Sequence, residues 1–223
     1  MKARGVTGSL FDEAGVETRR SREALAPGAF LLRARALDVE KELRKALDRI
    51  VAQAPFRHMI TPGGYQMSVA MTNCGDFGWV TDRRGYRYDP LDPDSAKPWP
   101  KMPAAFLDLA ARAAEEAGYG GFVPDACLIN RYEPGARLSL HQDRNELDFG
   151  APIVSVSLGL PATFLFGGDE RSDRARRVPI HHGDVAVWGG PSRLAFHGIA
   201  PLKEGEHEVM GRRRINLTLR RAG

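Results

Sequence analysis

Apolar residues recur with a helical period in two segments of the chain. Between Val39 and Gln53 they fall three and four positions apart, which predicts an amphipathic helix, and the preceding Asp38 offers a side chain that can cap it. A second such segment runs from Ala104 to Ala117, where Pro103 suits the first turn and Gly118 the end. The residues expected to face inward are Val39, Leu43, Ala46, Leu47, Ile50 and Val51 in the first helix, and Phe106, Leu109, Ala110, Ala113 and Ala117 in the second.

After Phe122 the pattern changes to short apolar runs that are separated by clusters of Gly, Pro and Asp. Several short strands with turn signals between them are typical of an all-β sandwich or barrel. We therefore expect a mostly β protein with flanking helices (α+β), whose core lies at about residues 122–221. The expected strands are Ala126–Tyr132, Ile153–Leu160, Thr163–Phe166, Asp184–Trp188 and Arg213–Arg220.

The remaining segments have a different character. Residues 1–27 are polar, charged and Gly-bearing as far as Pro27, which predicts a poorly ordered arm. Residues 56–102 carry many Gly, Pro, Tyr, Trp and Arg residues, which predicts loops and hairpins with short strands at Tyr65–Thr72 and Gly78–Thr81. Because 223 residues fit one large domain better than two small ones, we expect a single domain.

The chain has a formal net charge of +4 and a pI of about 9.3. A basic balance favours polyanionic partners, because neutralised phosphates release counterions, although many basic proteins bind no nucleic acid. The two cysteines, Cys74 and Cys127, lack zinc-ligand spacing and are expected to be free thiols in a reducing compartment. No apolar run is long enough to span a membrane and the N-terminus lacks a signal-peptide pattern, so we expect a cytoplasmic monomer.

A metal site is indicated by His141 and Asp143, because side chains two residues apart in an extended segment point to the same face. With His197 they would supply two imidazoles and one carboxylate. This set leaves coordination positions open and suits non-haem Fe(II), which must hold a co-substrate and oxygen together. The unit His182-Gly183-Asp184 is an alternative, but its Gly and the apolar run that follows favour a turn entering a strand.

The C-terminal strand suggests a binding site for a small dicarboxylate. Along residues 214–220 polar and apolar residues alternate, so Arg214 and Arg220 share one face. Two guanidiniums on one face repel each other unless an anion lies between them, and arginine pairs with carboxylates through two parallel hydrogen bonds. Asn130 and Tyr132 share a face of another strand and could add hydrogen bonds. A solvated basic edge strand explains the pattern equally well.

Aromatic and basic residues are interleaved between positions 79 and 88. Trp79, Tyr86 and Tyr88 lie among Arg83, Arg84 and Arg87. Such a mixture suits stacking on a nucleic-acid base together with contacts to its backbone. Ordinary hairpin packing is the better explanation if this pattern is taken alone.

Longer motifs are more specific than any of these patterns. They are Phe56-Arg57, Thr61–Tyr65 (TPGGY), Met67–Gly75 (MSVAMTNCG), Pro124–Tyr132 (PDACLINRY), Leu138–Asp143 (LSLHQD), Val187–Gly190 (VWGG) and the pattern R-x-N-L-T-x-R at Arg214–Arg220. Through these motifs the chain resembles the bacterial AlkB family of DNA-repair dioxygenases from about Phe56 to Arg220.

The resemblance implies a double-stranded β-helix (jelly-roll) core with a nucleotide-recognition lid at about residues 56–102. It also implies that Arg214 pairs with the distal carboxylate of 2-oxoglutarate, that Arg220 lies near the end that chelates iron, that Trp79 stacks on the target base and that Tyr86 contacts the nucleotide backbone. The residues implied are His141, Asp143 and His197 for Fe(II), Asn130, Tyr132, Arg214, Asn216 and Arg220 for 2-oxoglutarate, and Trp79, Tyr86, Arg87, Tyr88, Asn145 and Arg171 for the substrate.

One short segment departs from the family. Residues 144–146 read Arg-Asn-Glu, where the best-known family pattern has Lys, Asp and Glu. Asn145 accepts a hydrogen bond but brings no charge to attract a cationic alkylated base, and Glu146 is a candidate for the missing charge.

The activity implied is oxidative demethylation of 1-methyladenine and 3-methylcytosine in single- or double-stranded DNA, with RNA as a further candidate. It would consume 2-oxoglutarate and O₂ and release succinate, CO₂ and formaldehyde. Two alternatives stay open: a 2-oxoglutarate-dependent hydroxylase of a small molecule or protein side chain, and a non-catalytic metal-binding jelly-roll module.

Overall fold

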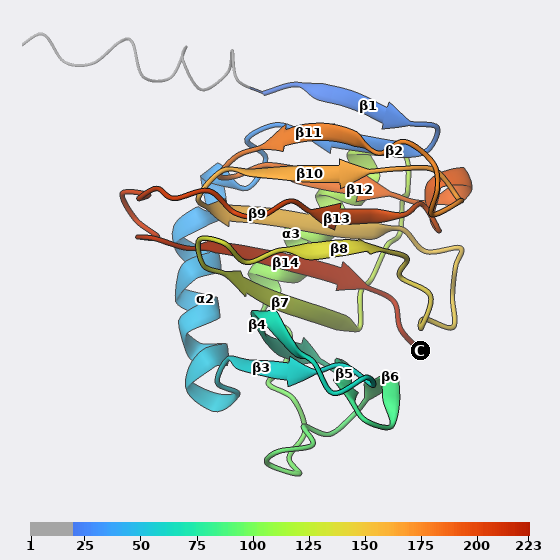
Figure 1. The fold of residues 1–223 in the computed structure, drawn as a ribbon. Helices are drawn as coiled ribbons and strands as arrows, with labels where there is room; N and C mark the ends of the chain where they lie inside the picture. Colours follow the sequence, from blue (N-terminus) through green and yellow to red (C-terminus); the bar gives the residue numbers. More distant parts are fainter. Residues whose placement is uncertain (1–19) are drawn as a thin grey trace, which may run out of the picture.

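The computed structural model describes residues 20–223, and residues 1–19 of the predicted arm lie outside the described part. The described chain forms an eight-stranded sheet, a four-stranded sheet and a two-stranded hairpin, and the strands within each of them pair antiparallel. In Figure 1 the four-stranded sheet lies in front of the eight-stranded sheet, and the helices lie on the far side of the larger sheet. The molecule therefore has three layers.

The elements are as follows. The eight-stranded sheet has the spatial order β1 (Arg22–Ala26), β2 (Ala29–Leu32), β12 (Val185–Trp188), β9 (Ile153–Gly159), β14 (Arg214–Arg220), β7 (Ala126–Tyr132), β4 (Gln66–Gly75) and β3 (Arg57–Ile60). The four-stranded sheet has the order β11 (Arg176–Ile180), β10 (Ala162–Phe166), β13 (His197–Ile199) and β8 (Leu138–His141), and the hairpin is β5 (Gly78–Asp82) with β6 (Gly85–Asp89). The helices are α2 (Glu40–Gln53) and α3 (Ala104–Glu116), with 3-10 turns η1 (Leu37–Val39) and η2 (Gly190–Ser192).

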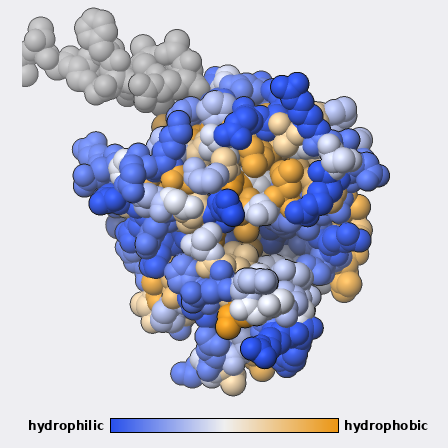
Figure 2. All heavy atoms as spheres, viewed as in Figure 1, coloured by the Kyte–Doolittle hydropathy of each residue, from blue (hydrophilic) through white to orange (hydrophobic). Residues whose placement is uncertain are grey.

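The apolar core has two parts, one on each face of the eight-stranded sheet. Leu43 of α2, Phe106 of α3 and Leu217 of β14 belong to the part between the helices and the sheet. Met71 of β4 and Phe164 of β10 belong to the part between the two sheets. Figure 2 shows that the outer face of the four-stranded sheet is largely hydrophilic, with hydrophobic residues in its middle part.

Strand β14 is a central strand and not a solvated edge. It pairs with β9 on one side and with β7 on the other, and all seven of its residues are buried. Leu217 and its apolar neighbours pack toward the helices, so the alternating polar residues face the space between the two sheets. Both predicted arginines of this strand therefore lie inside the molecule.

The helices agree with the sequence pattern, with one correction at a helix start. Helix α2 begins at Glu40 after the turn η1, and no side chain caps it. Asp38 does not cap the helix as predicted, because its carboxylate forms an ion pair with Arg20. Helix α3 has the predicted buried face.

Several strands were not predicted from the sequence. Arg22–Ala26 forms the edge strand β1, so the prediction of a poorly ordered arm is wrong for these residues. The other unpredicted strands are β2, β3, β6, β8, β11 and β13. They have five residues or fewer and depend on their neighbours in the sheet, so a local pattern gives little indication of them. None of the described helices has both the length and the apolar character that a membrane crossing requires.

We predict that Leu217→Ala lowers the free energy of unfolding by about 2–5 kcal/mol, because it leaves a cavity where α2, α3 and the central strands meet. The matched control is Leu147→Ala, since Leu147 is 83% exposed and its truncation should change stability by less than about 0.5 kcal/mol. Urea denaturation of both variants measures the difference. Equal losses would contradict this account of the core.

Candidate metal and substrate site

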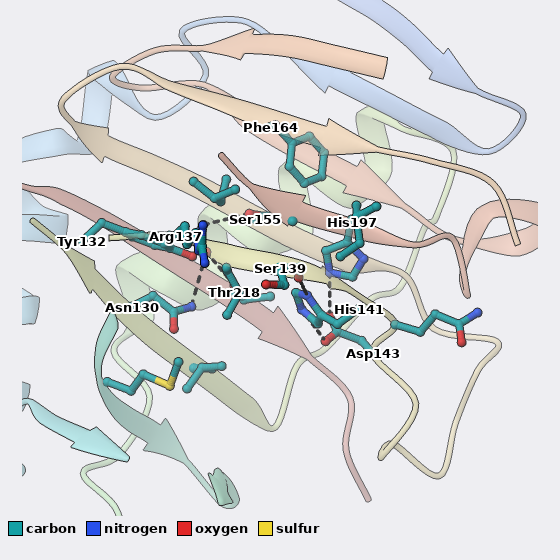
Figure 3. A pocket seen from close by; sticks show the side chains of 18 of the residues that line it. Asn130, Tyr132, Arg137, Ser139, His141, Asp143, Ser155, Phe164, His197 and Thr218 are labelled. Atoms are coloured by element: carbon teal, nitrogen blue, oxygen red, sulfur yellow. Dashed lines mark hydrogen bonds and ion pairs between the residues drawn. The ribbon is translucent and has the colours of Figure 1, made fainter. Parts of the chain in front are cut away.

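A cavity of about 1050 Å³ lies between the two sheets. Side chains from β7, β8, β13 and β14 point into it, as Figure 3 shows for Asn130, His141, His197 and Thr218. The hairpin β5–β6 contributes Trp79 and Tyr86 to the lining. The cavity therefore connects the buried polar face of β14 with the aromatic hairpin.

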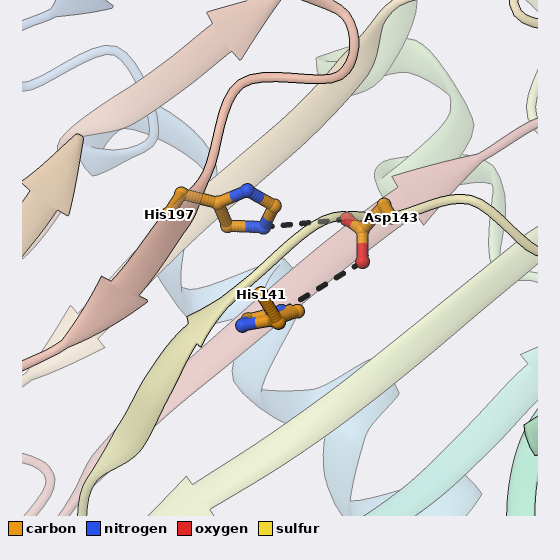
Figure 4. Close-up of side chains that lie close together, drawn as sticks. All are labelled: His141, Asp143 and His197. Carbon is orange, nitrogen blue, oxygen red and sulfur yellow. Dashed lines mark ion pairs between the residues drawn. The ribbon is translucent and has the colours of Figure 1, made fainter. Parts of the chain in front are cut away.

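His141, Asp143 and His197 converge in this cavity (Figure 4). His141 ends β8 and lies opposite His197, which begins β13, so the sheet register sets the two rings 4.4 Å apart between centroids. The Nε2 atoms of His141 and His197 lie 3.8 and 3.5 Å from the two carboxylate oxygens of Asp143. Among the described residues, no other group of three or more His, Cys, Asp or Glu side chains could hold a metal ion in this way.

Backbone carbonyls orient both imidazole rings. Nδ1 of His141 lies 2.8 Å from the carbonyl of Ser139, and Nδ1 of His197 lies 3.0 Å from that of Ala195. When each Nδ1 donates to its carbonyl, the Nε2 lone pairs face Asp143 and are free to bind an ion.

The charges also suit a divalent cation. Burial, together with the neighbouring His197, lowers the pKa of His141 to about 4, so the ring is neutral near pH 7. Burial would raise the pKa of Asp143, but Arg220 and the two imidazoles outweigh this effect and hold the pKa well below its usual range. Neutral imidazole and ionised carboxylate are the forms that bind metals.

The alternative H-x-D unit has a structural role. The carboxylate of Asp184 accepts hydrogen bonds from the backbone of Ala34 and His181 and from the guanidinium of Arg33. His182 accepts a hydrogen bond from the backbone of Gly159. These contacts fix the turn before β12, as the glycine in this unit suggested.

Arg214 and Arg220 lie in the same cavity but have different partners. Arg220 donates to Oδ2 of Asp143 at 2.6 and 3.0 Å. Arg214 is 1% exposed, and its guanidinium donates to the hydroxyl of Ser157 at 2.9 Å. Its Nε and Nη1 are buried and have no hydrogen-bond partner among the described residues. Burial accordingly lowers the pKa of Arg214, while Asp143 outweighs burial and raises the pKa of Arg220.

The surroundings of Arg214 fit a carboxylate. Its unpartnered Nε and Nη1 are donors, which a carboxylate can accept from. The ring of Tyr132 lies 4.9 Å from the guanidinium. An unpaired buried cation is costly, so an anion in this part of the cavity would be strongly favoured. Asn216 lines the cavity too, but its amide already bonds Ser155 and the strand backbone.

The hairpin β5–β6 forms an aromatic wall at one end of the cavity. The rings of Trp79 and Tyr86 are stacked, with centroids 5.6 Å apart and planes 20° apart. The indole N–H of Trp79 donates to Oδ1 of Asn145 at 3.3 Å, which connects the hairpin with the segment after Asp143. Arg171, from the loop between β10 and β11, lines the same cavity.

Arg87 and Tyr88 do not line the cavity, unlike the other predicted substrate residues. Arg87 pairs with Asp82 and Asp89 within the hairpin. The hydroxyl of Tyr88 donates to Glu146 at 2.6 Å and accepts from Arg220 at 3.2 Å. Burial raises the pKa of this hydroxyl, so it stays protonated and keeps both hydrogen bonds.

Glu146 does not supply charge to the cavity, which corrects the suggestion from the sequence. Its side chain is 1% exposed and is held by Tyr88, by Arg193 at 3.3 Å and by Arg220 at 3.5 Å. Arg193 also donates to the backbone carbonyl of Asp143 at 2.8 Å, so it supports the segment that carries the candidate metal ligand. The sequence analysis missed Arg193, and no local pattern distinguishes it from the other arginines.

A model of the 2OG-Fe(II) oxygenase superfamily matches residues 30–220, so the chain belongs to this superfamily. The superfamily uses Fe(II) and 2-oxoglutarate, and the donor set and the unpaired guanidinium fit both. Within the superfamily, the chain is a member of the AlkB family of 2-oxoglutarate-dependent dioxygenases.

The relatives on which this membership rests are similar over most of the chain. The alpha-ketoglutarate-dependent dioxygenase AlkB of Escherichia coli (strain K12) is 59% identical, over 90% of this chain and 93% of its own. An AlkB homolog of Caulobacter vibrioides is 45% identical, over 83% of each chain. The solved structure of OsALKBH1 matches with a TM-score of 0.79 and 27% identity, covering 90% of this chain and 100% of that one. The predicted jelly-roll core is thereby confirmed.

We predict that Tyr88→Phe lowers the free energy of unfolding by about 1–3 kcal/mol, because it leaves a buried carboxylate without one of its donors. Tyr86→Phe is the matched control in the same strand. The Tyr86 side chain is 48% exposed, and its loss of a hydroxyl should cost less than about 0.5 kcal/mol. Chemical denaturation compares the two. An unaffected Tyr88→Phe variant would show that Glu146 does not need this donor.

Proposed function

We propose that this chain oxidatively removes alkyl groups from N-alkylated bases of nucleic acid, 1-methyladenine and 3-methylcytosine among them. The observation that carries the proposal is one cavity with a metal-ligand triad, an unpaired buried guanidinium and a stacked aromatic pair. Relatives named for nucleic-acid substrates support it: a DNA N(6)-methyladenine demethylase of Arabidopsis thaliana and a tRNA demethylase of Schizosaccharomyces pombe. Both single- and double-stranded DNA, and RNA, are candidate substrates.

In this proposal His141, Asp143 and His197 hold the Fe(II) ion. When bound beside 2-oxoglutarate, the iron supplies the activation of O₂ that oxidises an alkyl carbon. The protein keeps the His141 imidazole neutral and the Asp143 carboxylate ionised, the forms that bind a metal. Trp188, whose ring lies 4.9 Å from that of His197, and Phe164, at 6.2 Å, close the interior side against solvent. Exclusion of water protects the reacting groups from side reactions.

Arg214 would bind the distal carboxylate of 2-oxoglutarate, because its unpartnered Nε and Nη1 offer the hydrogen-bond donors that this group requires. Asn130, whose unpartnered atom is the acceptor Oδ1, would line the co-substrate pocket beside it. Tyr132 and Asn216 would flank the co-substrate. Arg220 lies at the metal end and keeps the carboxylate of Asp143 in place through two short hydrogen bonds. This arrangement would point the keto-acid end of 2-oxoglutarate toward the triad.

The base would stack on Trp79, with Tyr86 toward the nucleotide backbone and Asn145 and Arg171 at the base edge. Tyr88 would not contact the base, and its hydroxyl would hold Glu146 in place by a hydrogen bond. Arg87 would stabilise the hairpin through its ion pair with Asp82. A base within a duplex cannot reach this cavity, so the enzyme must accept single strands or an extruded base. Bases alkylated on the pairing edge pair badly, which lowers the cost of extrusion.

The balanced conversion consumes one O₂ and one 2-oxoglutarate for each methyl group. The methyl carbon gains a hydroxyl, the resulting hemiaminal releases formaldehyde, and the base nitrogen recovers its pairing edge. Succinate and CO₂ are the other products. We further propose that the chain works as a monomeric, single-domain enzyme of the cytoplasm, where the neighbouring buried cysteines Cys74 and Cys127 stay reduced.

We predict that a methylated oligonucleotide releases formaldehyde only when Fe(II) and 2-oxoglutarate are both present. Asp143→Ala should abolish release, because the metal loses its only carboxylate ligand. The measurement is formaldehyde and succinate from the same reaction. Formaldehyde release without 2-oxoglutarate would refute the mechanism. Succinate without any aldehyde from nucleic acid would instead favour a hydroxylase of another substrate.

We predict that Arg214→Met raises KM for 2-oxoglutarate by about 10- to 100-fold, because it removes charge-assisted hydrogen bonds worth about 1.5–3 kcal/mol. The KM for the oligonucleotide should change little. Trp79→Ala should raise the KM for the oligonucleotide and change the KM for 2-oxoglutarate little, since it removes the stacking surface for the base. Arg177→Met, at an exposed position of β11, is the matched control and should change neither KM. A rise in KM for the oligonucleotide alone on Arg214→Met would contradict the assignment.

A further inference from the structure

The turn formed by His182, Gly183 and Asp184 holds the end of strand β9. The backbone carbonyl of Asp184 accepts from the amide of Ser157, and the amide of Gly183 donates to the carbonyl of Ser157, at 2.9 and 2.8 Å. Nδ1 of His182 accepts from the amide of Gly159 at 2.9 Å. Three consecutive residues of the turn therefore fix two residues of β9, and one of the contacts is made by an imidazole.

The same end of β9 lies against Arg214. Gly159 is opposite Arg214 where β9 pairs with β14, and the hydroxyl of Ser157 accepts from the guanidinium at 2.9 Å. The two backbones approach so closely that a Cβ on Gly159 would lie 2.3 Å from the carbonyl oxygen of Arg213. The backbone that carries Arg214 thus packs directly on the residue that His182 holds.

A second imidazole is stacked on His182. The ring of His207, in the loop between β13 and β14 at the left of Figure 1, lies 4.3 Å from it between centroids, with planes 33° apart. Nδ1 of His207 accepts from the amide of Val209 at 3.3 Å, and backbone hydrogen bonds in both directions join His207 to Gly211. The loop that holds the second ring therefore leads straight into β14.

This histidine pair is not arranged as a metal site. In each ring Nδ1 accepts a backbone N–H, so the proton of the neutral imidazole is on Nε2. Neither ring then has a lone pair left for an ion. The hydrogen bonds instead require that both rings stay neutral.

Protonation of His182 would break its contact with β9. The second proton would have to go to Nδ1, which faces the amide N–H of Gly159, and two donors cannot form a hydrogen bond with each other. The stacked ring of His207 adds repulsion if both imidazoles are charged.

The charged and titratable groups around His182 determine the pH at which this happens. They are His207 from the loop between β13 and β14, Glu40 and Arg44 from α2, and Asp184 from its own turn. Burial lowers the pKa of His182 below its ordinary value of 6.5, His207 and Arg44 add to this effect, and the two carboxylates oppose it. Both carboxylates are already paired with arginines. The contact is therefore complete above pH 6.5 and is lost as the pH falls from there through the lowered pKa.

We propose that His182 is a positioning residue for 2-oxoglutarate binding, which holds β9 against the strand of Arg214 and weakens co-substrate binding when it is protonated. The inference goes beyond the proposed dealkylation and does not depend on which base is the substrate. It rests on the proposed placement of the distal carboxylate of 2-oxoglutarate at Arg214.

The test measures the Kd of 2-oxoglutarate by calorimetry on protein saturated with Mn(II) in the absence of oxygen, so that no turnover occurs. Between about pH 7.5 and about pH 5, the wild-type Kd should rise by about two- to tenfold through this contact, the effect of one lost hydrogen bond. His182→Asn places an acceptor, Oδ1, near the position of Nδ1 and cannot be protonated. Its Kd should equal the wild-type value at neutral pH and rise less in acid. The ratio of the two Kd values at each pH cancels the titration of the metal ligands.

Three further variants define the cause. His182→Phe keeps the ring and removes the acceptor, so its Kd should be raised by about two- to tenfold already at neutral pH. His207→Phe removes one like charge, so the rise in Kd should begin at a higher pH. His181→Asn is the matched control, because the His181 ring is 60% exposed and lies against Asp184, 3.6 Å away, and not against β9. It should reproduce the wild-type profile.

An NMR titration of the histidine rings in the wild-type protein follows the same protonation without any substitution. The midpoint for His182 should lie below pH 6.5 and coincide with the rise in the Kd of 2-oxoglutarate. A purely structural role of His182 would lower the melting temperature of its variants and leave the pH profiles of their Kd parallel to that of the wild type.

The outcomes separate this inference from the placement of the co-substrate. An unchanged Kd in Arg214→Met would overturn both. A raised Kd in Arg214→Met, together with a wild-type pH profile in His182→Asn or wild-type binding by His182→Phe, would overturn the role of His182 alone. A changed profile in His181→Asn would overturn it too, because the effect would then not be specific to the ring that contacts β9.

Discussion

Two guanidiniums on one central strand are buried between the sheets, and each of them requires a negative partner. Arg220 finds its partner in Asp143, at 2.6 Å, within the protein itself. Arg214 has only the hydroxyl of Ser157 and keeps two buried nitrogens unpaired. Because a buried cation without a partner is costly, this asymmetry determines what the cavity accepts at each end. The end of the cavity at Asp143 suits a cation, and the end at Arg214 suits a carboxylate.

The ion pair between Arg220 and Asp143 also stabilises the segment that follows β8. Arg220 donates to the carboxylate of Asp143 in this segment. Arg193 donates to the backbone carbonyl of Asp143 and contacts Glu146. On the side of the hairpin, the indole of Trp79 donates a hydrogen bond to Asn145. The candidate metal ligand and the aromatic hairpin are therefore connected through one short segment, by contacts of Asp143, Asn145 and Glu146.

Local patterns were sufficient for the elements that are long or that alternate regularly. The polar and apolar alternation of β14 identified both arginines, and the spacing in α2 and α3 identified their buried faces. The H-x-D unit and His197 were also identified, because ligand chemistry constrains the residue types. The alternation could not show whether β14 was an edge strand or a central one, since that depends on pairing with β7 and β9.

What the sequence could not show depends on distant contacts. Strands β8 and β13 are short and carry the two histidines, so their pairing follows from the sheet and not from their own pattern. Tyr88 and Trp79 are cross-strand partners, yet only Trp79 lines the cavity, because Tyr88 is drawn to Glu146 and Arg220. Glu146 and Asn145 are adjacent in sequence and have opposite surroundings, one buried among cations and the other beside the indole. The charge of Glu146 is therefore matched by arginines inside the protein and does not reach the cavity lining, where Asn145 lies.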